Sequence, residues 1–360
     1  MRMRKRIYVS YYSAANLGDD MFLHLVAKEF GNTHFSAASS RPSASLRRLD
    51  NLALHHDLVP RLVQRAFPRT RLLDRYRLET ERVERGDGAL IIGGSLFIET
   101  GSSDDLKRLA HLRDLPRPYV LAGCNVGPWK TDRYREGVQA VVAGADLALI
   151  RDTASVSAMG SLPNVVSSTD LLFCYPLPSV PRTDGHLVVS VVDPARKGSP
   201  SSSIAYLERM ADLVADSLAL GLRVTLMSFC RYEGDLAAAR SIRHRLPADL
   251  ARRVSIHSYS GDIANSLSVL LSASHVVGGR FHAIILGMAG GAKILPISYG
   301  SKLSAVLTDI GYPGAMLQLE DMDAWPARSE LFDSFADFDV SAARSRAHGD
   351  FHLLECLLER

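Results

Sequence analysis

Short runs of apolar residues alternate with amphipathic segments along the whole chain. In the first half the apolar runs are 6–12, 88–92, 119–122 and 147–150, and each is followed within two residues by Gly, Asp or Ser. In the second half the runs are 186–192, 223–228, 254–256, 275–277 and 293–297. Such alternation is typical of βαβ units. The sequence therefore predicts an α/β protein with mostly parallel sheets.

A chain of 360 residues is too long for one ordinary core, which favours two domains. The stretch 175–185 contains three prolines and has no periodicity, as expected of a linker. We predict an N-terminal Rossmann-like domain over 1–178 and a second over 186–325. A C-terminal helical segment over 326–360 follows. Two domains of this kind would place the site in a cleft.

Overall charge gives little information about partners. The net charge is only +3, which argues against nucleic acid as a partner. One segment, from Arg41 to Arg85, is rich in arginine and is predicted to form a basic helical region. It is either a solvated helix face or a surface that meets anionic lipid, as a peripheral membrane contact, or a diphosphate-linked acceptor.

The remaining composition favours a cytoplasmic protein. The basic start is followed by an apolar stretch that is too short for an export signal, and no membrane span is predicted. The four cysteines are far apart and form no C-x-x-C pair, which fits reduced thiols and gives no zinc site.

The clearest candidate for an anion site is the segment 276–286, where a strand and a glycine pair lead into a helix. Arg280 and His282 fall in the first turn of that helix. A helix N-terminus and a guanidinium both favour an anion, and an imidazole titrates near neutral pH. The alternative is that Arg280 pairs with a structural carboxylate and that His282 is a core histidine.

Two more cations follow predicted strands. Lys302 comes after the run 293–297, and Arg151 comes directly after the run 147–150. Ligands of parallel α/β sheets bind beyond the carboxyl ends of strands, so both cations are candidates for an anion pocket. A solvated lysine, and an arginine that forms a salt bridge near Asp152, are the structural alternatives.

Three loops of the first domain also follow strands. Asn16 and Asp19 lie after the first strand, where helix capping is the simpler interpretation. Gly94 and Ser95 follow the second predicted strand, and Asn125 follows the third. These loops allow a sugar or a phosphate to approach the backbone. P-loop, zinc-protease, esterase and dinucleotide motifs are absent from the sequence.

In chain order these segments resemble the polysaccharide pyruvyl transferase family. The motifs are N-x-G-D at 16–19, Gly-Gly at 93–94, G-x-x-x-G-P at 123–128, R-D-x-x-S at 151–155, D-x-x-F at 170–173, R-x-H-A at 280–283 and S-Y-x-x-K at 298–302. The resemblance spans both predicted domains. It implies a GT-B-like pair of Rossmann domains, with phosphoenolpyruvate as the donor and no other cofactor.

The resemblance also implies roles for individual residues. His282 would be the catalytic acid, and Arg151, Arg280 and Lys302 would hold the donor. The reaction so implied also needs a base, and Asp19 is our candidate for it. Asn16, Gly94, Ser95 and Asn125 are the candidates for binding the acceptor, which would be a sugar, a glycan or a lipid-linked saccharide.

Two other functions remain open at this point. A GT-B glycosyltransferase would use the cations of the second domain to bind the diphosphate of a nucleotide sugar. A non-catalytic Rossmann-like protein would use them only to bind a metabolite.

Overall fold

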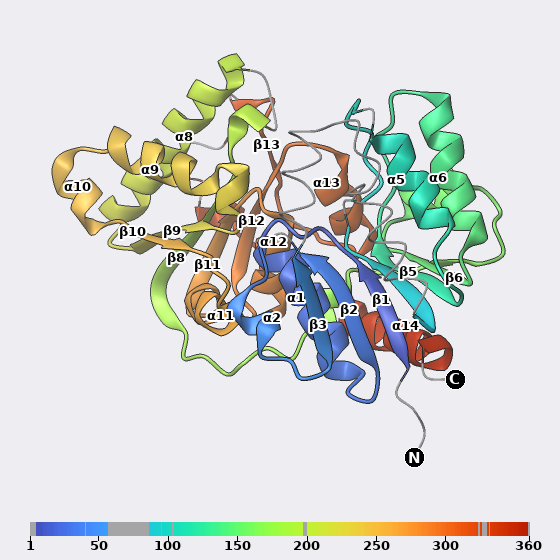
Figure 1. Ribbon diagram of the computed structural model, residues 1–360. Coiled ribbons are helices and arrows are strands. Elements are labelled where there is room, and N and C mark those ends of the chain that lie inside the picture. Colours follow the sequence, from blue (N-terminus) through green and yellow to red (C-terminus); the bar gives the residue numbers. More distant parts are fainter. Residues whose placement is uncertain are drawn as a thin grey trace. The chain divides into compact units, whose positions relative to one another are not determined.

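The computed structural model describes residues 5–39, 41–56, 86–94, 96–102, 104–196, 200–322, 325, 330 and 332–358. The described residues form two compact units (Figure 1). The first unit comprises Met1–Ala14, Asp19–Cys174 and Ser345–Arg360. The second comprises Ala15–Gly18 and Tyr175–Arg344.

The first unit is built on a seven-stranded, fully parallel sheet in the order β3-β2-β1-β4-β5-β6-β7. The strands are β1 (Arg6–Ser10), β2 (His34–Ser39), β3 (Leu52–His56), β4 (Gly88–Ile92), β5 (Tyr119–Cys124), β6 (Leu147–Ile150) and β7 (Val165–Ser167). Strands β4, β5 and β6 are buried along their whole length, which explains their continuous apolar runs.

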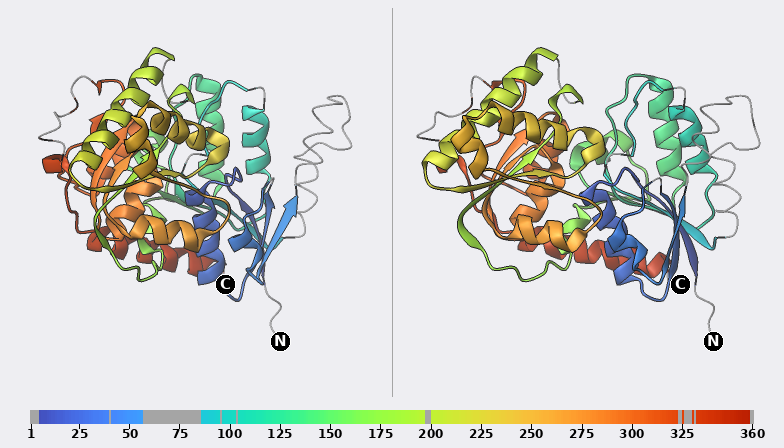
Figure 2. Two further views of the ribbon diagram at one scale, coloured as in Figure 1. Left: turned by 90° about the vertical axis from the view of Figure 1, so that its left-hand side faces the viewer. Right: turned by 60° about the vertical axis from the view of Figure 1, so that its left-hand side comes forward.

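Helices cover both faces of this sheet (Figure 2). The helices are α1 (Leu17–Glu29), α2 (Ala44–Arg47), α5 (Asp105–Arg113), α6 (Asp132–Gly144) and α7 (Thr153–Met159), with a 3₁₀ turn η2 (Leu171–Cys174). Buried apolar side chains of α5 and α6 pack with those of the central strands to form one core. Thr131 caps α6 and Asp152 caps α7.

The second unit contains a six-stranded parallel sheet in the order β10-β9-β8-β11-β12-β13. The strands are β8 (Thr183–Val191), β9 (Arg223–Ser228), β10 (Ser255–Ser258), β11 (Ala273–Gly278), β12 (Lys293–Ser298) and β13 (Leu317–Gln318). The chain reverses its direction of progress across the sheet between β8 and β11. This reversal is the topological switch point, beside which Rossmann-like sheets bind ligands.

The second sheet also has helices on both faces. They are α8 (Pro200–Ala219), α9 (Asp235–Arg245), α10 (Ala248–Arg253), α11 (Ile263–Leu271), α12 (Phe281–Ala289) and α13 (Ser301–Asp309), with 3₁₀ turns η3 (Pro194–Arg196), η4 (Arg231–Glu233) and η6 (Phe332–Ser334). Figures 1 and 2 show α8 and α9 on one face and α11 and α12 on the other. Buried apolar side chains of α8 and α9 pack with those of the strands to form an apolar core.

The last helix, α14 (Ser341–Leu358), begins in the second unit and ends in the first. In the first unit, Phe351 stacks on Phe30, the residue after α1, at a ring distance of 6.0 Å. The buried carboxyl group of Asp350 accepts a hydrogen bond from the Ser168 hydroxyl at 2.6 Å. The end of the C-terminal segment, from Ser345 onward, is therefore part of the first unit's packing.

The predicted α/β class with two mostly parallel sheets is confirmed, and all nine predicted strands are present within a few residues. Four strands were not predicted, namely β2, β3, β7 and β13. Strand β2, with the sequence HFSAAS, alternates buried and half-buried positions but carries only one large apolar side chain. Of the predicted basic region from Arg41 to Arg85, residues 57–85 lie outside the described residues.

Candidate functional site

In the first unit, the guanidinium of Arg151 lies at the carboxyl end of β6 and is almost fully buried. Its Nη1 donates to Asp170 Oδ2 and its Nη2 donates to Asn125 Oδ1, each at 2.9 Å. The Arg151 and Asp170 side chains are 3% and 0% exposed. A buried charge needs such a partner because desolvation otherwise favours its neutral form. Asp170 also accepts from the backbone N–H of Leu172 at 3.0 Å, which fixes its position.

The glycine pair after β4 explains how Arg151 fits. A Cβ on Gly94 would lie 2.2 Å from Arg151 Cζ, so only glycine leaves room for the guanidinium. Gly94 also accepts a hydrogen bond from Asn125 N at 3.0 Å, which joins the loops after β4 and β5. Asp19 is buried, and its Oδ1 lies 3.4 Å from the position of a Cβ on Gly93. The structure thus brings four predicted residues, Asp19, Gly94, Asn125 and Arg151, to one edge of the first sheet.

The N-x-G-D loop connects β1 with α1. Asn16 Oδ1 accepts from the Gly18 backbone N–H at 3.0 Å, which is the turn and capping role considered for this residue. Leu17 N donates to Phe229 O at 3.1 Å, within the second unit. Ser95, predicted to bind the acceptor, lies outside the described residues.

In the second unit, Arg280 follows β11, at the topological switch point of the sheet. Its Nε donates to Asp235 Oδ2 at 2.8 Å, its Nη2 donates to Asp235 Oδ1, and its Nη1 donates to Glu233 Oε2 at 2.6 Å. Burial acts to lower the pKa of Arg280, but the carboxylates of Asp235 and Glu233 outweigh it and raise that pKa. The guanidinium is therefore charged at every physiological pH. The ion pairing that the sequence left open for Arg280 is present.

The turn before Arg280 requires glycine. Gly278 has a φ of +144°, and a Cβ on it would lie 2.1 Å from the carbonyl oxygen of Ser190 in β8. The close contact of these two neighbouring strands at their carboxyl ends fixes where the β11–α12 turn begins. Arg280 is thereby placed beside the loop that follows β9.

His282 lies in the first turn of α12 and is half-buried. Its ring lies edge-on to Phe281 at 5.1 Å. On another side it adjoins Gly18, where a Cβ would come within 1.8 Å of Nδ1. His282 is therefore enclosed by the R-x-H-A turn and by the glycine of the N-x-G-D loop.

Lys302 lies in the first turn of α13, after β12, and is half-buried. Strands β11 and β12 pair in parallel, so Arg280, His282 and Lys302 all follow strands at one edge of the sheet. The loops after these two strands also touch, since a Cβ on Gly279 would lie 3.4 Å from Tyr299 Cδ1.

Sequence reasoning missed three acidic residues. Asp170 holds Arg151, and Asp235 and Glu233 hold Arg280. Each lies shortly after a strand or strand-like run, and Asp170 begins the D-x-x-F motif. An acidic residue at a strand end is thus the signal that could have identified them as partners of the buried arginines.

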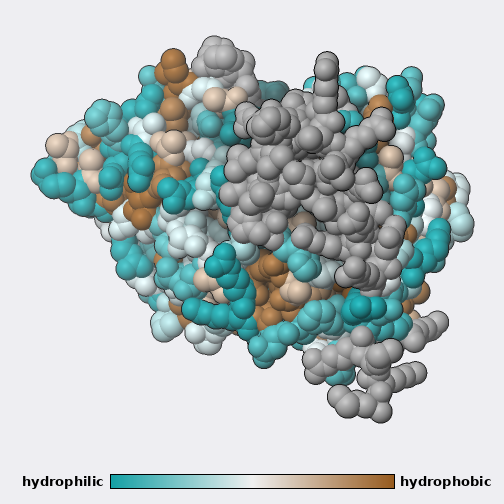
Figure 3. Space-filling model, viewed as in Figure 1, coloured by the Kyte–Doolittle hydropathy of each residue, from teal (hydrophilic) through white to brown (hydrophobic). Residues whose placement is uncertain are grey.

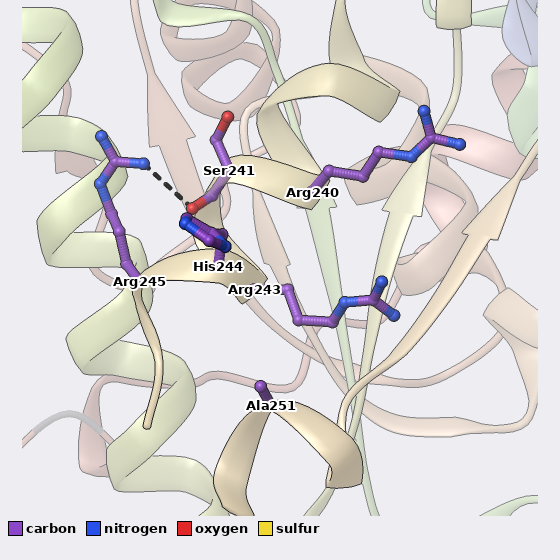
Figure 4. A pocket seen from close by; sticks show the side chains of 6 residues that line it. All are labelled: Arg240, Ser241, Arg243, His244, Arg245 and Ala251. Carbon is purple, nitrogen blue, oxygen red and sulfur yellow. Dashed lines mark hydrogen bonds between the residues drawn. The ribbon is translucent and has the colours of Figure 1, made fainter. Parts of the chain in front are cut away.

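A cavity of about 520 Å³ lies apart from these residues, between α9 and α10 (Figure 4). Its lining residues are Arg240, Ser241, Arg243, His244, Arg245 and Ala251. Arg240 and Arg243 point to one side, whereas Arg245 points to the other and donates to Ser241 O at 3.0 Å. The guanidinium groups diverge, so they do not form a convergent anion site. Figure 3 shows mainly hydrophilic residues where α10 lies in this view.

Some features are absent from the part of the chain that the structure describes. Among these residues there is no group of three His, Cys, Asp or Glu side chains that could hold a metal ion. No described helix has the length and apolarity required to cross a lipid bilayer.

The fold defines a class of protein, the α/β proteins built from two Rossmann-like units. UDP-GlcNAc 2-epimerase from Methanocaldococcus jannaschii is similar over 98% of this chain and 99% of its own, with a TM-score of 0.57 and 9% identity. A glycosyltransferase from Rickettsia africae is similar over 100% of both chains, with a TM-score of 0.54 and 8% identity. HepE from Anabaena, solved with UDP and glucose, is similar over 98% of this chain and 99% of its own, with a TM-score of 0.55 and 10% identity.

The polysaccharide pyruvyl transferase family model matches residues 16–301. The chain therefore belongs to the polysaccharide pyruvyl transferase family, as its motifs predicted. None of the curated proteins matches it. The match begins at Asn16 of the N-x-G-D loop and runs past the R-x-H-A turn into α13.

Proposed function

We propose that this protein transfers the pyruvyl group of phosphoenolpyruvate to two hydroxyls of a sugar, in a polysaccharide or its precursor, and forms a cyclic ketal. The observation that carries the proposal is that Arg280, His282 and Lys302 follow adjacent parallel strands of the second sheet, in a chain of this family. Phosphoenolpyruvate bears a carboxylate and a phosphate, so its binding needs fixed cations next to a proton donor.

His282 is the proposed acid, and it gives a proton to the methylene carbon of phosphoenolpyruvate, which becomes a methyl group. The former enol carbon is then oxocarbenium-like, and one sugar hydroxyl adds to it. The bond from this carbon to the phosphate oxygen breaks, and a second hydroxyl closes the ketal. Of the two hydroxyl protons lost, one balances the proton gained by carbon, and the other leaves with phosphate or solvent. Positioning of both hydroxyls contributes several kcal/mol.

Arg280 and Lys302 are proposed to hold the donor in the second unit. The resemblance adds Arg151 as a donor ligand. The reaction also needs a base, for which Asp19 is the candidate, and Asn16, Gly94, Ser95 and Asn125 are proposed as acceptor contacts. Asp19, Asn125 and Arg151 are buried, so each would act through few exposed atoms. No cofactor other than the donor enters the scheme. We further propose a cytoplasmic location, because the donor phosphoenolpyruvate would be present there.

The decisive experiment measures phosphoenolpyruvate binding by calorimetry and by the shift in thermal unfolding, because a ligand of the native state raises its stability. Wild type is compared with Lys302→Met, which removes a half-buried cation without breaking the buried Arg280 pair. Saturable binding that weakens at least tenfold in Lys302→Met supports the proposal. Phosphate release is then followed with a panel of saccharide acceptors.

The second candidate is a glycosyltransferase, favoured by the likeness of the fold to the Rickettsia glycosyltransferase. The same titration therefore includes a panel of nucleotide sugars. Binding of a nucleotide sugar without binding of phosphoenolpyruvate would replace the pyruvyl transfer proposal with this candidate. Anion binding with no turnover on any acceptor would favour a metabolite-binding protein.

A further inference from the structure

Arg280 is bound by two carboxylates in different ways. Both carboxylate oxygens of Asp235 accept hydrogen bonds from one edge of the guanidinium, formed by Nε and Nη2. Glu233 Oε2 accepts a hydrogen bond from Nη1, at an N–O distance of 2.6 Å. An anionic substrate that binds Arg280 needs N–H donors that Asp235 does not use, and Glu233 accepts from one of these, on Nη1.

The two carboxylates differ in how firmly they are held. The Asp235 side chain is 0% exposed, and its Oδ2 also accepts from the backbone N–H groups of Phe229 and Cys230, at 3.1 and 2.9 Å. It lies in the first turn of α9, where a helix N-terminus further favours a carboxylate. Asp235 is therefore a fixed part of the fold.

Glu233 ends the short 3₁₀ turn η4, and its side chain is 13% exposed. The preceding Tyr232 is exposed, and the following Gly234 has a φ of +94°. A longer side chain on a short, partly exposed turn has more rotamers available than the buried Asp235. Glu233 can thus leave Arg280 by side-chain rotation while Asp235 keeps the guanidinium in place.

The local charge leads to the same conclusion. One guanidinium and two carboxylates give this cluster a formal charge of −1. A further anion brought to Arg280 would be repelled by Glu233 at short range in a site of low dielectric constant. Removal of Glu233 from contact leaves a neutral pair of Arg280 and Asp235, which can accept an anionic oxygen through the free end of the guanidinium.

We propose that the Glu233 carboxylate is a built-in competitor, which occupies the anion position on Arg280 and is displaced by an anionic oxygen of the donor. This inference rests on the proposed function, because the donor considered is phosphoenolpyruvate. The displaced position accepts either a carboxylate or a phosphate oxygen. Asp235 is the positioning residue that holds Arg280 for either one.

The test substitutes Glu233→Gln, which keeps the side-chain shape and removes the charge. Calorimetric titration with phosphoenolpyruvate is expected to show a dissociation constant about tenfold lower than that of wild type, the equivalent of one hydrogen bond to a charged group. Glu208→Gln, at an exposed position of α8 in the same unit, is the matched control and should bind as wild type does. Urea unfolding is expected to be nearly unchanged in both variants.

Pyruvate and inorganic phosphate, titrated separately, distinguish the two groups of the donor. If pyruvate binds more tightly to Glu233→Gln than to wild type, the donor carboxylate occupies the Glu233 position. If inorganic phosphate binds more tightly, the donor phosphate occupies it. Equal or weaker binding of phosphoenolpyruvate in Glu233→Gln, with normal binding in wild type, would overturn the competitor role and leave the proposed function standing. Binding in Glu233→Gln but not in wild type would support both. Binding in neither protein would overturn both.

Discussion

Gly18 and His282 are in such close contact that a methyl group on Gly18 would overlap the imidazole ring. A Cβ built on Gly18 lies 1.8 Å from Nδ1 and 2.4 Å from Cγ of His282. Two motifs that are more than 260 residues apart in the sequence therefore meet within the second unit. The glycine of the N-x-G-D loop is needed for the orientation of the histidine.

Gly18→Ala is expected to turn the His282 ring out of its position, because the added methyl and the ring cannot share the space. If His282 is the acid, turnover should fall at least tenfold, since proton transfer depends on alignment. Phosphate release measured at saturating phosphoenolpyruvate checks this. Gly31→Ala is the matched control, because a Cβ on Gly31 meets nothing within 4 Å. Full activity in Gly18→Ala would show that the orientation of this ring is unimportant.

His282→Gln should lower the rate of phosphate release by about 10² to 10⁴, the usual contribution of a general acid. The dissociation constant of phosphoenolpyruvate should change by less than threefold, because Arg280 and Lys302 are intact. A variant that retains wild-type turnover would remove His282 from the proposed mechanism.

Asp170→Asn is expected to reduce the free energy of unfolding by about 3 kcal/mol, because the buried Arg151 charge loses its ionic partner. Urea denaturation measures this change. Asp132→Asn is a suitable control, since Asp132 pairs with Arg135 at 3.0 Å on the surface, with side chains 81% and 44% exposed. That exposed pair contributes less than about 1 kcal/mol. Equal effects of the two substitutions would contradict a special role for burial at Arg151.

The pH dependence of stability should differ between two aspartates near and within α14. Burial raises the pKa of Asp350, although the hydrogen bond from Ser168 opposes it. The folded state then binds a proton more tightly than the unfolded state, so the contribution of Asp350 to stability falls as pH rises from the ordinary value of 3.8 through the raised pKa. Asp350→Asn mimics the protonated form. Its stability relative to wild type should rise over that range and stay constant above it.

For Asp339 we expect the opposite pH dependence of stability. Hydrogen bonds from the backbone N–H and hydroxyl of Ser341 lower the pKa of Asp339. Its stabilising contribution is present above the ordinary pKa and is lost as pH falls through the lowered value. Asp339→Asn should therefore be less stable than wild type at neutral pH and equal to it in acid. Thermal unfolding across pH 2 to 7 compares the two variants, and shifts of the same sign would contradict the opposite pKa shifts of Asp350 and Asp339.

The sequence determined much of the fold because buried parallel strands read as continuous apolar runs. Strands β4, β6 and β9 have the predicted bounds without change. Strands β2 and β7 were missed because their side chains are small or half-buried, and only pairing with a neighbouring strand stabilises them. The local amino-acid composition does not reveal such pairing.

The sequence also placed Arg151, Arg280, His282 and Lys302 directly after strands, since strand ends and glycine turns are local features. Only the tertiary structure paired Arg280 with Asp235 and Glu233, and Arg151 with Asp170 and Asn125. Those partners are 19 to 47 positions away in the chain. A buried charge selects its partner by proximity in space. The sequence therefore determined which residues are candidates for chemistry, and the fold decided which carboxylates hold them.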